Sequence, residues 1–196
     1  PASAKVGDVV TVTGTYMTGG SFTIGGVTAT PVATFTPTAA KALLVVPAGV
    51  SVSSVVGDAP VVVTTDGGSN AGKAFTVLGA PTISSLSAAT AFAGNSVTIT
   101  GSNLVNPSAS PSTAAITVKV GAIAVPGADV TINSATSVTF KVPSNAVPGT
   151  STVSVTTLGG VASTSSFKVL IVPTIASVAP ASAKVGDVVT VTGTYM

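Results

Sequence analysis

Apolar and polar residues alternate along many short runs of this chain, and most of these runs are rich in valine and threonine. Ile116, Val118 and Val120 fall on one face of such a run, while a threonine and a lysine between them fall on the other. A period of two is typical of a β-strand with one buried and one wet face. Since no segment sustains a period of 3.6 residues, we expect an all-β protein with almost no helix.

Glycine, proline, asparagine and aspartate bound these runs, as expected for strands joined by turns. The first set of predicted strands is Val9–Thr13, Ser21–Ile24, Val27–Thr30, Val32–Thr36, Lys41–Val46, Pro60–Thr65 and Lys73–Val77. The second set is Pro81–Ser87, Ser96–Gly101, Ala115–Val120, Asp129–Ile132, Ser137–Val142, Thr150–Thr157 and Ser163–Val169. The phenylalanines within these strands are expected in the core: Phe22, Phe35, Phe75, Phe140 and Phe167.

The chain repeats itself at two levels. The run from Pro1 to Met17 recurs letter for letter from Pro180 to Met196, which gives a period of 179 residues. Inside that period, residues 81–83 recur as residues 173–175, 92 positions later, with lower identity around them. Repeats of this kind indicate a tandem array of related domains.

The two levels of repetition predict three segments. Residues 1–79 form a sandwich that lacks its own first strand, residues 80–171 form a complete sandwich, and residues 172–196 supply the first strands of a further repeat. Each sandwich has the size of a seven-stranded immunoglobulin-like domain. Because the linkers are short, we expect a stiff rod with apolar contacts between repeats at Leu170, Ile171, Val172 and Pro173.

The segment 172–196 has two explanations. In the first, which we favour, the sequence is a window on a longer array and the next copy continues in the same polypeptide. In the second, separate subunits polymerise head to tail, and each tail donates strands to the next subunit. In both cases the segment belongs spatially to a neighbouring repeat, because a lone strand pair cannot bury a core.

The order of signals in the second segment carries a family resemblance. The run from Gly94 to Leu104 is followed by Val118 to Gly121, by Pro148-Gly149 and by Gly159-Gly160 before the closing Phe167. This series strongly resembles the IPT/TIG family of immunoglobulin-like domains. The resemblance covers residues 81–170 fully and residues 1–78 less cleanly. It implies immunoglobulin-like β-sandwiches arranged end to end, of the kind that occur in transcription factors, receptor ectodomains and bacterial surface proteins.

Composition narrows the function. Charged residues make up 6% of the chain and the net charge is +2, so there is no basic cluster to neutralise phosphates, and we expect no nucleic-acid partner. Histidine and cysteine are absent, and the few aspartates fall in turns or at strand ends, so we expect no catalytic residue, no metal site and no cofactor. There is no run of about 18 apolar residues and hence no transmembrane segment in this sequence.

Near-identical tandem copies, low charge and no cysteine resemble the repeat region of a bacterial adhesin or extracellular fibre. We expect a non-enzymatic structural unit of a stalk or filament at the cell surface, whose partners are neighbouring copies of the same repeat, with lateral association of rods. The alternatives are a carbohydrate-binding module and a subunit that polymerises by strand donation. Tyr16 and Tyr195 are candidates for a sugar-stacking or inter-repeat contact, although packing in the core or a loop is the favoured interpretation.

Overall fold

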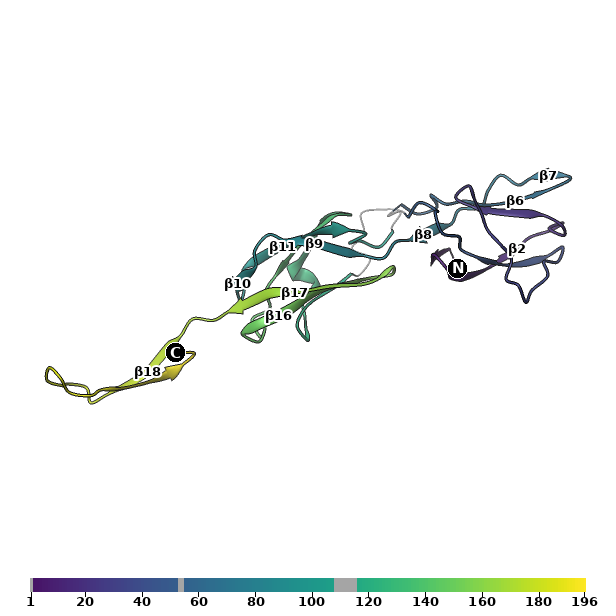
Figure 1. The fold of residues 1–196 in the computed structure, drawn as a ribbon. Helices are drawn as coiled ribbons and strands as arrows, with labels where there is room; N and C mark the ends of the chain where they lie inside the picture. The colour runs from purple at the N-terminus through teal and green to yellow at the C-terminus, as the bar shows by residue number, and fades with distance from the viewer. Residues whose placement is uncertain (1, 53–54, 108–115) are drawn as a thin grey trace.

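The computed structural model of the chain describes residues 2–52, 55–107 and 116–196. Pro1 and Ala115, which open the repeated run and one predicted strand, lie outside the described residues. Two β-sandwiches and a C-terminal β-hairpin follow one another along an extended molecule (Figure 1). The protein is all-β, and the helical structure in the described part of the chain is a 3₁₀ turn, Gly127–Asp129.

The second sandwich consists of two facing sheets. Its strands are β9 (Thr82–Leu86), β10 (Thr90–Phe92), β11 (Ser96–Ser102), β12 (Thr117–Val120), β13 (Ile123–Ala124), β14 (Val130–Ser134), β15 (Ser137–Lys141), β16 (Gly149–Thr157) and β17 (Gly160–Leu170). One sheet has the order β10-β17-β16-β12-β13 and the other β14-β15-β11-β9. Strand β11 therefore has a neighbour on each edge.

The alternating residues of these strands meet between the sheets. Val118 and Val120 are buried, whereas Lys119 between them is exposed, as the alternation predicts. Phe140 from one sheet and Phe167 from the other make an edge-to-face contact, with ring centroids 6.5 Å apart. Burial of such side chains is the main favourable term in folding. The chain has no cysteine, so no disulfide adds to it.

The first sandwich has the same plan with shorter strands. They are β1 (Ser3–Lys5), β2 (Val9–Thr13), β3 (Ser21–Ile24), β4 (Val27–Thr28), β5 (Lys41–Val45), β6 (Val61–Thr65), β7 (Gly68–Ser69) and β8 (Thr76–Leu78). Strand β2 pairs with β5, as β11 pairs with β15. Among the described residues, no strand pairs with the other edge of β2, where β9 would lie in the second sandwich.

Both sandwiches join an early strand to their last strand in parallel. Strand β1 pairs with β8, and β10 pairs with β17, with Thr90 opposite Lys168 and Phe92 opposite Leu170. In a parallel pair of this kind, an early strand and the last strand of the domain lie side by side and run in the same direction. The start of the first and the end of the second therefore lie at opposite ends of the pair.

The C-terminal hairpin joins β18 (Thr174–Ala179) to β19 (Thr190–Thr194). Thr174 lies opposite Thr194 and Ile175 opposite Gly193, as Thr82 lies opposite Ser102 and Ile83 opposite Gly101 in the second sandwich. The hairpin is therefore the counterpart of β9 and β11 without the rest of a sandwich. Every residue of β18 is exposed.

Three expectations about the first sandwich are wrong. The predicted strand Val32–Thr36 is reduced to an isolated bridge between Pro31 and Leu44, because proline lacks an N–H and a turn follows at once. Phe35 is consequently half-buried instead of part of the core, and the Lys41 ammonium lies 5.8 Å from its ring centroid. The predicted strand Lys73–Val77 is shifted to Thr76–Leu78, and Lys73 makes only an isolated bridge to Val61.

The core assignment predicts a contrast between two phenylalanines of the second sandwich. Phe167 is fully buried, so Phe167→Ala should destabilise this sandwich by about 3–5 kcal/mol. Phe92 is 41% exposed, so Phe92→Ala should cost less than about 1 kcal/mol. Calorimetry should show a fall in melting temperature of more than about 10 °C for the first variant. Equal shifts for both variants would contradict the assignment of the core.

Candidate functional site

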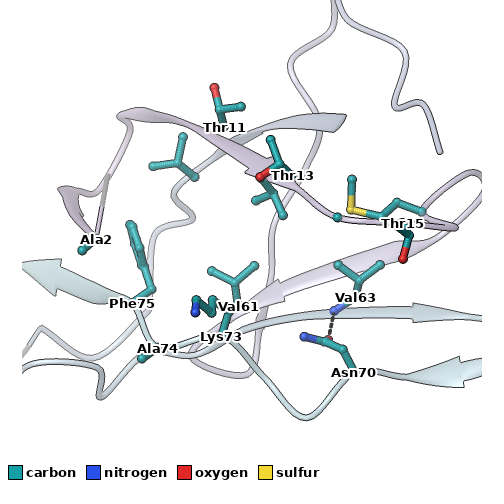
Figure 2. Close-up of a pocket in the computed structure, with 14 residues that line it drawn as sticks. Ala2, Thr11, Thr13, Thr15, Val61, Val63, Asn70, Lys73, Ala74 and Phe75 are labelled. Atoms are coloured by element: carbon teal, nitrogen blue, oxygen red, sulfur yellow. Dashed lines mark hydrogen bonds between the residues drawn. The ribbon is translucent and has the colours of Figure 1, made fainter. Parts of the chain in front are cut away.

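A groove of ≈ 610 Å³ runs along the unpaired edge of β2 in the first sandwich. Figure 2 shows β2 on one side, with Thr11, Thr13 and Thr15, and β6 with the chain at Lys73 to Phe75 on the other. The groove occupies the place that β9 fills in the second sandwich. It is lined by Ala2, Val10, Thr11, Val12, Thr13, Gly14, Thr15, Met17, Val61, Val63, Asn70, Lys73, Ala74 and Phe75.

The apolar floor of the groove is incompletely covered. Val12 and Val63 are half-buried, whereas the residues at the same places in the second sandwich, Ile99 and Val155, are fully buried. The difference follows from β9, because Ile83 and Leu86 pack against the second core and have no counterpart over the first. The groove thus leaves apolar surface in water that a further strand would remove from it.

Two glycines mark where a further strand would approach. At Gly101 an added Cβ would overlap the carbonyl oxygen of Thr82 in β9, so this position requires glycine. Gly14 holds the same place in β2, but an added Cβ there would meet only the Met17 side chain, 3.1 Å from its sulfur. The sequence of β2 therefore keeps a residue suited to close backbone approach where no described strand approaches.

A second pair of matching glycines lies near the junction between the domains. In the second sandwich, an added Cβ at Gly159 would overlap the carbonyl oxygen of Gly79 in the preceding linker. Gly67 is the matching residue of the first sandwich, and the nearest group to an added Cβ there is the Thr65 hydroxyl at 3.7 Å. No described backbone approaches Gly67, whereas linker backbone lies against Gly159.

The groove contains few polar side chains. The Val63 N–H donates to the Asn70 Oδ1 at 2.7 Å, a contact drawn in Figure 2, and Lys73 is exposed. The remaining polar groups are threonine hydroxyls and backbone groups, and the described lining residues include no carboxylate. In the part of the chain that the structure describes, no group of His, Cys, Asp or Glu could hold a metal ion. No helix there has the length and apolar character to cross a membrane.

The residues proposed from the sequence lie outside the groove. Leu170 ends β17 half-buried, and Ile171, Val172 and Pro173 form an exposed linker before the hairpin. Their role as an inter-repeat contact remains a prediction.

The two tyrosines are exposed. Tyr16 is 87% and Tyr195 60% exposed, so the favoured interpretation of packing in the core or a loop is wrong. Both have a positive φ, of 56° and 58°, as does Asn103 at the matching place in the second sandwich. The Asn103 side-chain amide donates to the carbonyl oxygen of Ala80 at 3.0 Å, which ties the linker to this sandwich. In the second sandwich, the residue that corresponds to the tyrosines therefore contacts the preceding linker.

Comparison with known proteins agrees with this architecture. Two facing sheets with this strand order define an immunoglobulin-like β-sandwich. Residues 81–169, which form the second sandwich, match the model of the IPT/TIG domain. A search of the curated proteins found no match.

Several solved structures are similar at low identity. They include the surface glycan-binding protein PbSGBP-B from Prevotella bryantii, with 22% identity over 83% of this chain and 36% of that chain, and a TM-score of 0.44. SGBP-B from a xyloglucan utilization locus of Bacteroides uniformis has 22% identity over 84% and 46%, with a TM-score of 0.41. The plexin A4 extracellular region has 16% identity over 87% and 17%, with a TM-score of 0.42. The chain spans less than half of the length of each of these proteins, and nothing about its ligand follows from them.

The two matched glycines give a test of the open groove. Gly101→Ala should destabilise the second sandwich by more than about 2 kcal/mol, because backbone blocks the added methyl group. Gly14→Ala should change the stability of the first sandwich by less than about 1 kcal/mol, because only a flexible methionine side chain lies near. Urea unfolding at low protein concentration measures both. A large loss with Gly14→Ala would mean that a strand already fills the groove.

Proposed function

We propose that this chain is a non-catalytic structural repeat of an extended stalk or filament at the surface of a bacterial cell. The observation that carries the proposal is the parallel pairing of an early strand with the last strand in both sandwiches. The exact repetition of residues 1–17 at 180–196 supports it, because it gives the array a regular unit.

The parallel pairs orient the sandwiches to resist tension. When the ends of the second sandwich are pulled apart, β10 and β17 are drawn in opposite directions along their own length. Their backbone hydrogen bonds, including the bond from the Lys168 N–H to the Ala89 carbonyl oxygen at 2.9 Å, are then loaded together and not one after another. A domain loaded in this way suits a mechanical spacer.

The low charge of the chain favours contacts between copies of the same repeat. With 6% charged residues, the chain has little charge repulsion to keep copies apart, which supports contacts between neighbouring repeats and lateral association of rods. The ion pair between Lys141 and Asp129, at 3.5 Å, is exposed and contributes little.

Pulling on single chains tests the mechanical role. We expect each sandwich to unfold in its own step, with a gain in contour length of about 300 Å for about 90 residues. Ala91→Pro removes an N–H from β10 and should lower the unfolding force of the second sandwich without changing that length. Thr90→Ala, which leaves the backbone intact, is the matched control. An unchanged force in Ala91→Pro would contradict the mechanical role of this pair.

Carbohydrate binding is the second candidate function. The observation in this chain that favours it is the exposed ring of Tyr16, held by a left-handed backbone at the end of β2 near the threonine-lined groove. Aromatic faces and hydroxyl groups are what a sugar surface contacts. Xyloglucan oligosaccharides, which the name of the Bacteroides uniformis locus mentions, serve as the first probe.

Calorimetric titration decides between the two candidates. Under the structural role, the chain gives no saturable heat with xyloglucan oligosaccharides, and Tyr16→Ala behaves as the unmodified chain. Saturable binding that Tyr16→Ala abolishes and Thr90→Ala retains would establish the carbohydrate-binding function instead.

A further inference from the structure

We infer that the second sandwich holds the linker from the first sandwich in a preformed cradle, and that this contact couples the stabilities of the two sandwiches. The cradle consists of Asn103, Asn106, Thr157 and Gly159. It lies at the end of the second sandwich that faces β8 (Figure 1). The inference rests on the proposed function as a repeat unit and adds what couples one sandwich to the next.

The turn between β16 and β17 is fixed from within the second sandwich. The Leu158 N–H donates to the Asn106 Oδ1 at 2.6 Å, and the Gly159 N–H donates to the Thr157 hydroxyl oxygen at 3.1 Å. Asn106 and Thr157 are both buried. Because a buried hydrogen bond is costly to break without a replacement, the turn has one favoured position and offers the linker a fixed surface.

The linker fits against this surface without room for a side chain. An added Cβ at Gly159 would overlap the carbonyl oxygen of Gly79, and one at Gly79 would overlap the side-chain amide of Asn103. The same amide donates to the carbonyl oxygen of Ala80 at 3.0 Å. Asn103 has a φ of 52°, a conformation that asparagine adopts more readily than most residues. The turn and the amide therefore hold the linker at two successive residues.

The first sandwich takes part in the same contact. Leu78, the last residue of β8, is 8% exposed, yet it belongs to neither of the hydrophobic cores among the described residues. With Val105 and Pro107 of the second sandwich it lines a cavity of only ≈ 10 Å³, about the space of one water molecule. Its neighbour Val77 is fully buried in the first core. The burial of Leu78 thus depends on both sandwiches.

Coupled stability follows from this shared contact. If the first sandwich unfolds, β8 no longer holds Leu78 at the cavity, and the hydrogen bond from Asn103 then has to order a free linker by itself. A favourable interface between neighbouring repeats adds to the stability of each. By linkage, the second sandwich must stabilise the first to the same extent.

Hydrogen exchange in the whole chain tests the coupling. Phe22→Asp and Ile24→Asp, made together, place two charges in the first core and should unfold the first sandwich in buffer. Amide NMR signals then verify that the second sandwich remains folded. We expect the amides of Val153 and Val155 in β16 to exchange about tenfold faster than in the unmodified chain, the effect of losing contacts worth one or two hydrogen bonds.

Two variants of the contact show whether the cradle carries this effect. Asn103→Gly removes the amide and keeps a left-handed backbone, which glycine adopts freely. Gly79→Ala places a methyl group against the same amide. In either background, unfolding the first sandwich should change the exchange rates by less than about twofold. Asn95→Gly, the same replacement in the exposed turn between β10 and β11, is the matched control and should keep the tenfold effect.

Two results would overturn the inference. Equal exchange rates in the second sandwich, whether or not the first is folded, would show that the sandwiches are independent. A difference that persists in both Asn103→Gly and Gly79→Ala would locate the coupling outside the cradle. The pulling experiment with Ala91→Pro concerns the pair of β10 and β17, which lies away from the linker, so failure of this inference and failure of the mechanical role are separate outcomes.

Discussion

The close approach of one backbone to another at a glycine governs this structure. In the second sandwich, the Thr82 carbonyl oxygen lies against Gly101, and this lets β9 pair with residues 99–102 of β11, with a shift in register between Thr100 and Gly101. That pairing closes the core over Ile99 and directs the preceding linker past Gly159 and Asn103. Core closure and the alignment of consecutive domains therefore depend on the same strand.

Alternation along the sequence was enough to predict the fold class and most of the second sandwich. Val118, Lys119 and Val120 lie as their alternation requires, because a strand with one wet face allows only that arrangement. The failures lie where the pattern is not decisive. The run at Val32–Thr36 is rich in β-branched and aromatic residues, but proline and a turn limit it to a bridge beside Pro31. Strands as short as β1 and β10 carry too few residues to show a period.

The groove could not be predicted from periodicity, since alternation tells which face of a strand is buried but not which edge has a neighbour. The usable signal was the repeat itself. Gly14 and Gly67 match Gly101 and Gly159, and in the second sandwich those glycines meet backbone. A glycine that recurs at matching places of two repeats therefore marks the edge at which backbone approaches, which the hydrophobic pattern does not reveal. Tyr16 lies beside the groove without lining it, and Tyr195 lies in the C-terminal hairpin, away from the groove.

One strand pairing recurs along the chain. The register of β18 on β19 reproduces that of β9 on β11, so the hairpin makes the same backbone pairs as the start of the second sandwich. What the hairpin lacks is a facing sheet: Ile175 and Val178 lie in water, whereas their counterparts Ile83 and Leu86 pack against the second core. Burial between two sheets, and not strand pairing, therefore distinguishes a closed sandwich from a strand pair.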